Sequence, residues 1–137
     1  MIRLGRTIPA LPVRDTAASV EHYRSRLGFE ALHQDEGFAV LCRDDAVVHL
    51  WQSADESWRE RGSVDRPVRS GAETFLAGTA SCRIEVAGVD ELHAELQAAG
   101  VLHPVSRTGV DTTDFGTREF SAVDTDGNLL SFFTWVT

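Results

Sequence analysis

The chain has 137 residues, of which 42% are hydrophobic and 25% charged, and its formal net charge is −8. This composition is ordinary for a single soluble globular domain, and the negative charge disfavours binding to the phosphate backbone of nucleic acids. No apolar run reaches the ~18 residues that a membrane-spanning helix requires. The N-terminal sequence lacks the apolar stretch and cleavage site of a signal peptide, so we expect a cytoplasmic protein.

The first half of the sequence combines short strand patterns with one helix. Residues 7–13, TIPALPV, form a strand pattern whose prolines are tolerated on an edge strand. A helix is predicted next, because Asp15 is a good N-cap, apolar residues recur at helical spacing, and Gly28 is a good stop. Three further strands are predicted, at residues 29–35, 38–43 and 46–52.

These patterns dissolve between residues 53 and 79, where the sequence is polar and rich in Gly, Pro, Ser and charges. We expect a linker or loop there, of a length that is often functional, and its first part, residues 54–62, is compatible with a short helix. The patterns then return. A strand, a helix and two strands around the turn DTDGN are predicted at residues 81–88, 89–101, 118–123 and 129–135.

Both halves therefore share one order of elements: a strand, a helix and about three strands. The sequence predicts a single domain over residues 1–137, built from two βαβββ modules at residues 1–52 and 80–137. Asp15 and Asp90 are expected to play the same role at the start of their helices, as are Gly28 and Gly100 at the ends.

Several short motifs stand at fixed places in this doubled pattern. They are LGF at 27–29, RDD at 43–45, GVDEL at 88–92, GTREF at 116–120 and DTDGN at 124–128, together with Pro9, Arg14, Asp15 and Phe38. They span nearly the whole chain outside the linker, and their combination resembles the bleomycin resistance proteins of the vicinal-oxygen-chelate superfamily. The resemblance implies an α+β fold in which each module curls a mixed sheet and the concave faces form a cleft.

In the enzymes of that superfamily the cleft holds a divalent metal, bound by His, Glu or Gln at two places in each module. The matching positions here are Ile8 and His49 in the first module, and Arg83, or its neighbour Cys82, and Ser131 in the second. Only His49 is a plausible ligand, and the charge of Arg83 would repel a metal ion. We therefore expect no bound metal, no other cofactor and no catalysis.

Strand alternation gives an independent view of the cleft wall. If His49 points into the cleft, Val47 and Trp51 do so too. If Ser131 points into the cleft, Leu129 and Phe133 point into it as well. Such a wall is apolar and aromatic with a few polar points, which suits a groove for a flat ligand better than a metal site.

The residues expected to bind ligand are Phe38, His49, Trp51, Arg83, Asp114, Phe115, Arg118, Ser131 and Phe133. Several of them have a plain structural alternative. His49 is equally compatible with a satisfied interior histidine, and Arg118 with fixing the start of its strand. Arg83 would need a carboxylate partner if it were buried, for which Glu85 and Glu119 are the candidates.

The resemblance implies a homodimer that confers antibiotic resistance by sequestering bleomycin-type drugs. The first strand would be exchanged between subunits about a hinge at Pro9, which would leave two grooves at the dimer interface. A flat bithiazole-like ring would stack on Phe38 and Phe115, and a cationic tail would meet an acidic rim. The candidates for that rim are Asp35, Glu36, Asp111 and Asp114.

Two alternatives remain open. One is a metal-dependent lyase or dioxygenase, in which His49 would have to converge with Glu85, Glu119 or Asp114. The other keeps the groove but replaces bleomycin by another small aromatic ligand. Phe115 favours this second alternative, because it stands where the family usually carries Trp.

Overall fold

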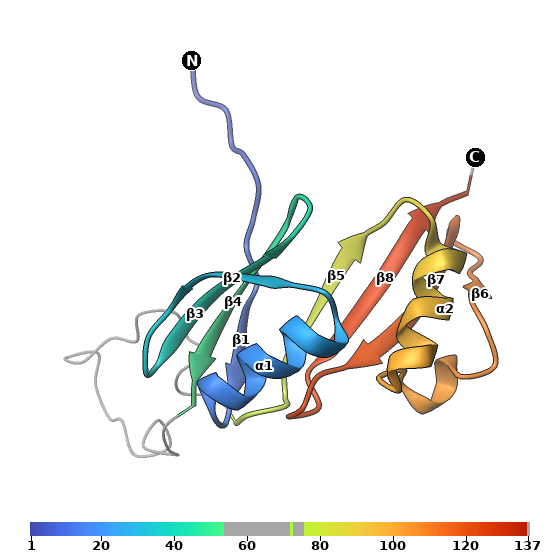
Figure 1. Ribbon diagram of the computed structural model, residues 1–137. Helices are drawn as coiled ribbons and strands as arrows, with labels where there is room; N and C mark the ends of the chain where they lie inside the picture. Colours follow the sequence, from blue (N-terminus) through green and yellow to red (C-terminus); the bar gives the residue numbers. More distant parts are fainter. Residues whose placement is uncertain (54–71, 73–75, 137) are drawn as a thin grey trace.

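The computed structural model describes residues 1–53, 72 and 76–136. The predicted fold of two βαβββ modules is confirmed (Figure 1). The first module contains, in chain order, β1 (Ala10–Val13), α1 (Thr16–Arg26), β2 (Glu30–Gln34), β3 (Phe38–Arg43) and β4 (Ala46–Gln52). The second contains β5 (Ser81–Glu85), α2 (Val89–Ala99), a 3₁₀ turn (Pro104–Ser106), β6 (Asp111–Thr112), β7 (Thr117–Val123) and β8 (Leu129–Trp135). Most of the expected linker, with its helix pattern at 54–62, lies outside the described residues.

The two sheets have the same topology. Their strand orders are β1-β4-β3-β2 and β5-β8-β7-β6, and each sheet has one parallel pair, β1 with β4 and β5 with β8. The other neighbouring strands are antiparallel. This repeated arrangement is the internal duplication that the sequence predicts.

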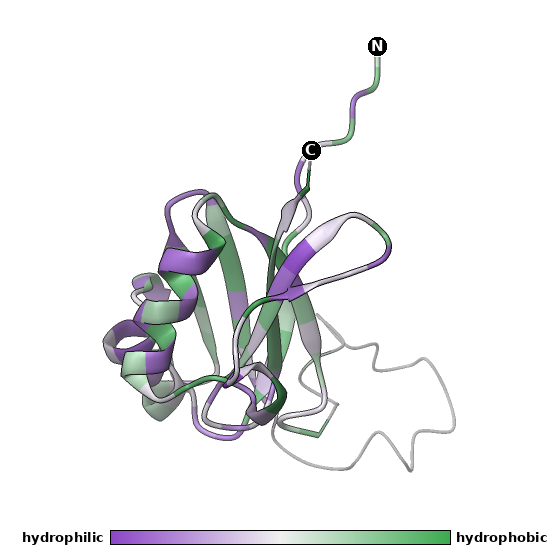
Figure 2. Ribbon diagram, turned by 90° about the vertical axis from the view of Figure 1, so that its right-hand side faces the viewer, coloured by the Kyte–Doolittle hydropathy of each residue, from purple (hydrophilic) through white to green (hydrophobic). Residues whose placement is uncertain are grey.

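Helices cover one face of each sheet and leave the opposite face open (Figure 2). The covered face carries side chains such as Leu41, Leu50, Leu130 and Phe132, which belong to one core cluster shared by both modules. Alternate residues of the same strands are only half-buried and form the open faces. None of the helices in the described part of the chain is long and apolar enough to cross a membrane.

A buried polar network joins the two modules. The hydroxyl of Tyr23 in α1 donates to Asp124 Oδ2 at 2.9 Å, and the Asn128 amide donates to the Pro12 carbonyl oxygen at 2.8 Å. Asp124 also accepts from the Asn128 amide, at 2.9 Å, and from the backbone N–H of Asp126. Burial, and then the Asp124 carboxylate, raise the pKa of Tyr23 well above its usual range. The DTDGN motif therefore acts as a joint between modules.

Two expectations about the ends of elements are wrong. The first strand begins at Ala10 rather than residue 7, and the nine residues before it form an extended arm that projects from the body (Figure 1). The N-cap of α2 is Gly88, in a left-handed conformation with φ 87°, so Asp90 does not share the capping role of Asp15. Asp15 does cap α1, because its carboxylate accepts the N–H of Ala18 at 3.0 Å.

Candidate ligand-binding site

Four rings form a cluster on the open face of the first sheet. The ring centroid of Phe38 lies 4.5 Å from that of Trp51, 5.1 Å from that of His49 and 5.7 Å from that of His33. The strand register explains the cluster, since Phe38 pairs with Trp51 across β3 and β4. The structure therefore brings three predicted residues together and adds His33. A flat aromatic ligand would find several stacking partners here.

Sequence reasoning missed His33 because β2 is irregular. The register slips between Ala31 and His33, and this bulge places His33 opposite Val40, on the same face as Phe38. Strict alternation from Glu30 would have placed Leu32 there instead. His33 also contacts the Asp35 carboxylate at 3.1 Å. The backbone N–H of Gly37 and then His33 lower the pKa of Asp35.

The open face of the second sheet has a different character, built around an ion pair. Arg83 on β5 donates to Glu119 on β7 at 2.8 Å, across β8, and its guanidinium lies 4.7 Å from the centroid of the Phe133 ring. Hydrogen bonding to Glu119 raises the pKa of Arg83, and the same contact lowers the pKa of the Glu119 carboxyl. The ion pair considered from the sequence exists, and Glu119 rather than Glu85 is its partner.

Ser131 lies beside this pair and has a partner of its own. Its hydroxyl is 3.1 Å from the hydroxyl of Ser121 on the neighbouring strand. Phe133, two residues further, packs edge-on against Trp135 with 5.7 Å between ring centroids. The second sheet thus presents hydroxyl groups, an ion pair and aromatic rings on one surface.

The positions that correspond to metal ligands do not converge on a metal-binding set. The register pairs His49 with Ala10 and Ser131 with Arg83. Ile8, which the resemblance matches to a metal-ligand position, lies two residues before β1 and offers no metal-binding side-chain atom. Within the described residues, no group of three or more His, Cys, Asp or Glu side chains is placed to hold a metal ion.

Arg118 stands apart from the other predicted site residues. Phe120 and Ala122 of β7 belong to the buried core, so alternation places Arg118 on the same helix-covered side of the sheet. There its guanidinium binds Asp90 of α2 in a bidentate ion pair, at 2.7 and 2.9 Å. Its side chain is therefore not part of the open face. Within the motif GTREF, Arg118 lies on the helix-covered side of the sheet and Glu119 on the open side.

The expected acidic rim is split within one copy of the chain. Asp35 and Glu36 follow β2, whereas Asp111 and Asp114 lie in and after β6, at the opposite end of the molecule (Figure 1). Phe115, in the turn between β6 and β7, has 62% of its surface exposed. Phe115 and Asp114 are thus exposed but are not near Phe38 in the same copy.

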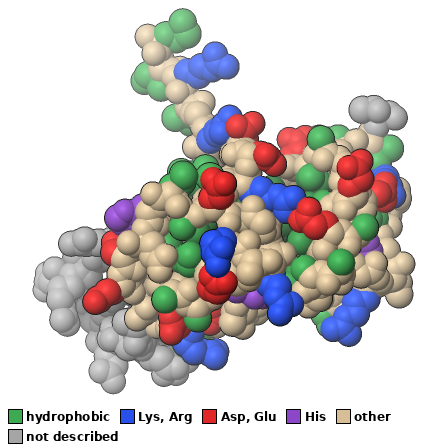
Figure 3. Space-filling view, viewed as in Figure 1, with side chains coloured by type: hydrophobic (Ala, Val, Ile, Leu, Met, Phe, Trp, Pro, Cys, Tyr) green, Lys and Arg blue, Asp and Glu red, His purple; other side chains and the backbone are tan. Residues whose placement is uncertain are grey.

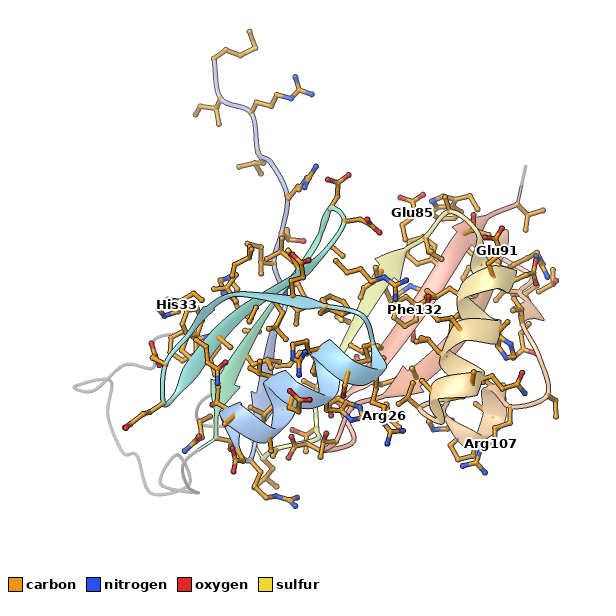
Figure 4. All side chains as sticks on the ribbon, viewed as in Figure 1. Arg26, His33, Glu85, Glu91, Arg107 and Phe132 are labelled. Atoms are coloured by element: carbon orange, nitrogen blue, oxygen red, sulfur yellow. The ribbon has the colours of Figure 1, made fainter. Side chains whose placement is uncertain are left out.

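A groove of about 450 Å³ lies between the modules on the helix side. Its apolar floor includes Leu27, Phe29, Ile84 and Phe132, and its rim carries Asp44, Asp45, Glu85, Glu91 and Glu95. Acidic and basic side chains alternate over this face (Figure 3), and Glu85 and Glu91 lie at the same end of the second module (Figure 4). The one arginine of the rim, Arg43, is bound by Glu95 at 2.6 Å and spans the two modules.

Comparison with known proteins places this geometry in context. The model of the Glyoxalase/Bleomycin resistance protein/Dioxygenase superfamily matches residues 3–132. Bleomycin resistance proteins from Geobacillus stearothermophilus and Staphylococcus aureus are each 48% identical over 127 residues, which is 93% of this chain and 94% of the relative. The bleomycin-binding protein of bleomycin-producing Streptomyces verticillus, solved with copper(II)-bleomycin, has a TM-score of 0.71 and 27% identity, covering 96% of this chain and 97% of that one.

Proposed function

We propose that this chain, which belongs to the Glyoxalase/Bleomycin resistance protein/Dioxygenase superfamily and to its bleomycin resistance branch, confers resistance by sequestering bleomycin-type drugs in the cytoplasm. The mechanism is stoichiometric binding without chemical change of the drug. The observation that carries the proposal is the four-ring cluster around Phe38 on an open sheet face, in a chain 48% identical to bleomycin resistance proteins.

The ring cluster supports binding of a flat heteroaromatic group. Phe38 is held by its contacts with Trp51 and His49, so its ring is already oriented before a ligand arrives. Each aromatic pair contributes about 0.5–1.5 kcal/mol beyond the burial of apolar surface. Tight binding therefore needs several such contacts at once, which a cluster of rings supplies and a single exposed phenylalanine does not.

We propose that the protein is not an enzyme and has no metal cofactor. The four positions that the resemblance matches to metal ligands hold Ile8, His49, Arg83 and Ser131, of which only His49 offers a ligand atom suited to a transition metal. Arg83 places a positive charge beside Ser131, and Glu119 is already engaged by that charge. A cation at this place would have to displace the guanidinium.

We further propose that two copies form a homodimer through their N-terminal arms, hinged at Pro9. Met1, Ile2 and Leu4 have over 90% of their surface exposed, which is costly for an isolated subunit in water. β5 is an edge strand, so an extended arm from a second copy has an edge to pair with. In one copy, a groove of about 690 Å³ lies between residues 83–87 and the chain's own Arg6, Thr7 and Pro9. In that dimer, the ring cluster of one copy would face the second sheet of its partner and close two binding sites.

Titration with bleomycin tests the central proposal. Metal-free and copper-loaded drug are added to the full chain while tryptophan fluorescence and heat are recorded, because Trp51 lies within the ring cluster. We expect saturable binding of one drug per chain at micromolar concentration or below, and copper alone serves as the control for quenching. Absence of both a saturable signal and heat at micromolar drug would reject sequestration and direct the search to another small aromatic ligand.

Two further measurements test the remaining parts. Protein purified without chelator should contain no stoichiometric Ni, Zn, Mn or Fe, and a metal bound through His49 would instead support the lyase or dioxygenase alternative. Removal of residues 1–8 should convert a dimer to a monomer in light scattering and abolish saturable drug binding. A full-length chain that is monomeric while it binds drug would contradict the dimer.

A further inference from the structure

We propose that the Arg83–Glu119 pair is a ligand subsite that recognises a neutral primary carboxamide. The proposal rests on the function proposed above, because it takes the open face of the second sheet as one wall of the drug site. It goes beyond that function by naming the chemical group that this wall selects.

The orientation of Arg83 is fixed from two directions. Its Nη2 donates to Glu119 Oε2 at 2.8 Å, and its guanidinium carbon lies 4.7 Å from the centroid of the Phe133 ring. The contact of Nη1 with Glu119 Oε1 is longer, at 3.4 Å. A guanidinium carries five N–H groups, and no other acceptor for Arg83 is found among the described residues. Several donors of a preorganised planar cation therefore remain available to a ligand.

Glu119 is also held in place, and its Oε2 atom makes stronger contacts than its Oε1 atom. Its Oε2 accepts from Arg83 and from the Thr117 hydroxyl, the latter at 2.7 Å, and Thr117 is in turn 2.8 Å from the Thr113 hydroxyl. The Oε1 atom has only the 3.4 Å contact with Arg83. It therefore keeps the capacity to accept a further hydrogen bond.

A free donor and a free acceptor thus lie side by side on a surface whose two charges cancel. A primary carboxamide fits both at once, because its oxygen accepts from Arg83 while its N–H donates to Glu119 Oε1. A carboxylate has no donor for Glu119 Oε1, and an ammonium group has no acceptor for the N–H groups of Arg83, so each leaves one side of the pair unmatched. The Phe133 ring and the Ser131–Ser121 hydroxyl pair lie on the same face, so an amide attached to a flat ring has a place beside them.

A purely structural ion pair is the competing explanation, and charge inversion separates the two. The double variant R83E/E119R keeps one positive and one negative partner but exchanges the donor and acceptor sides. If the pair only stabilises the sheet, this exchange is tolerated. If the pair recognises an amide, the exchanged pair presents an acceptor at position 83, where the amide needs a donor, and a donor at position 119, where it needs an acceptor.

The test is titration of wild type, Arg83→Gln, Glu119→Gln and the inverted pair with metal-free bleomycin, a glycopeptide that contains primary carboxamides. We expect each variant to bind at least about tenfold more weakly, as for loss of a hydrogen bond to a charged group. Arg24→Gln is the matched control: it removes the exposed Arg24–Glu21 ion pair on α1, and affinity should not change. Wild-type affinity in the inverted pair, or in both single variants, would overturn the proposal. Thermal unfolding midpoints confirm that each variant is folded.

A second experiment separates failure of this subsite from failure of the proposed function. The Arg83 Nε–H resonance is followed by NMR while benzamide, benzoate or benzylamine is added to the wild-type chain. We expect a saturable shift with benzamide that benzoate and benzylamine do not match, even if bleomycin itself fails to bind. Equal responses to the three compounds, or none to benzamide, would overturn the subsite whatever bleomycin does.

Discussion

The two modules share their topology and core but differ on their open faces. In the first, Phe38, Trp51 and two histidines form a ring cluster. In the second, the same region carries the Arg83–Glu119 ion pair and paired serine hydroxyls. The core-facing residues of both sheets, such as Leu41, Leu50, Leu130 and Phe132, fill one shared core and are apolar in both modules. Residues on the open faces are free of that constraint, and it is there that the duplicated halves differ.

The helices show the same contrast on a smaller scale. α1 starts with a side-chain cap from Asp15, whereas α2 starts at the left-handed Gly88 and carries Asp90 and Glu91 in its first turn. Acidic residues there interact favourably with the helix dipole. Asp90 is additionally held by Arg118. In α2, acidic residues in the first turn thus take the place of the capping side chain of α1. Both helices have the same length.

The largest expected effect comes from breaking the joint between the modules. Asp124 is 5% exposed and accepts hydrogen bonds from Tyr23 and Asn128. Asp124→Ala leaves the Tyr23 hydroxyl and one N–H of the Asn128 amide without an acceptor, so the free energy of unfolding should fall by about 3–5 kcal/mol. Urea denaturation followed by circular dichroism measures it. Tyr23→Phe, which removes one hydrogen bond, should cost about 1–2 kcal/mol. Equal losses for the two variants would contradict this account of the network.

The next effect concerns the first module's ring cluster. Phe38→Ala removes the ring that contacts Trp51, His49 and His33, and we expect drug affinity to fall by about 10- to 100-fold, the range of an aromatic hot spot. Calorimetric titration measures the change. Leu32→Ala is the control, because Leu32 is 62% exposed on β2 of the same sheet but lies outside the cluster. An unchanged affinity in the Phe38 variant would remove the first sheet from the site.

A smaller, pH-dependent effect is expected at His22. Its Nε2 is buried without a hydrogen-bond partner among the described residues, and burial lowers its pKa against the opposing influence of Asp124. A base with a lowered folded pKa adds stability that is present above the unfolded value of about 6.5 and is lost as pH falls through the folded value. Urea midpoints at pH 7.5, 6.5 and 5.5 should therefore fall more steeply for wild type than for His22→Gln. Parallel slopes would show that His22 does not contribute.

The smallest effect on binding is expected at Arg118. Its ion pair with Asp90 lies on the helix-covered side of the sheet, away from Arg83 and Phe133. Arg118→Gln should leave drug affinity within experimental error of wild type in the same calorimetric titration. A loss comparable to that of Arg83→Gln would place Arg118 in the site after all and erase the distinction between the two faces of β7.

Periodicity and turn residues were sufficient to predict the doubled module, because most strands alternate between polar and apolar residues and Asp15, Gly28 and Gly100 mark the ends of helices. It was not sufficient for details that depend on pairing between strands. The bulge in β2 places His33 in the ring cluster, and β1 begins at Ala10 rather than at residue 7. Nor does periodicity measure distance between elements: Asp35 and Asp114 lie at opposite ends of one copy, so a common rim would require the proposed dimer.

The joint at Asn128 also has a consequence for how the chain folds. Asn128 contacts Pro12 across 116 residues, and Asp124 contacts Tyr23 across 101. Contacts so distant in sequence raise the contact order and are closed at a high entropic cost, which slows folding. During synthesis the first module would have its side of the joint open until residues 124–128 leave the ribosome. Closure of the joint would then follow the folding of each module's local contacts.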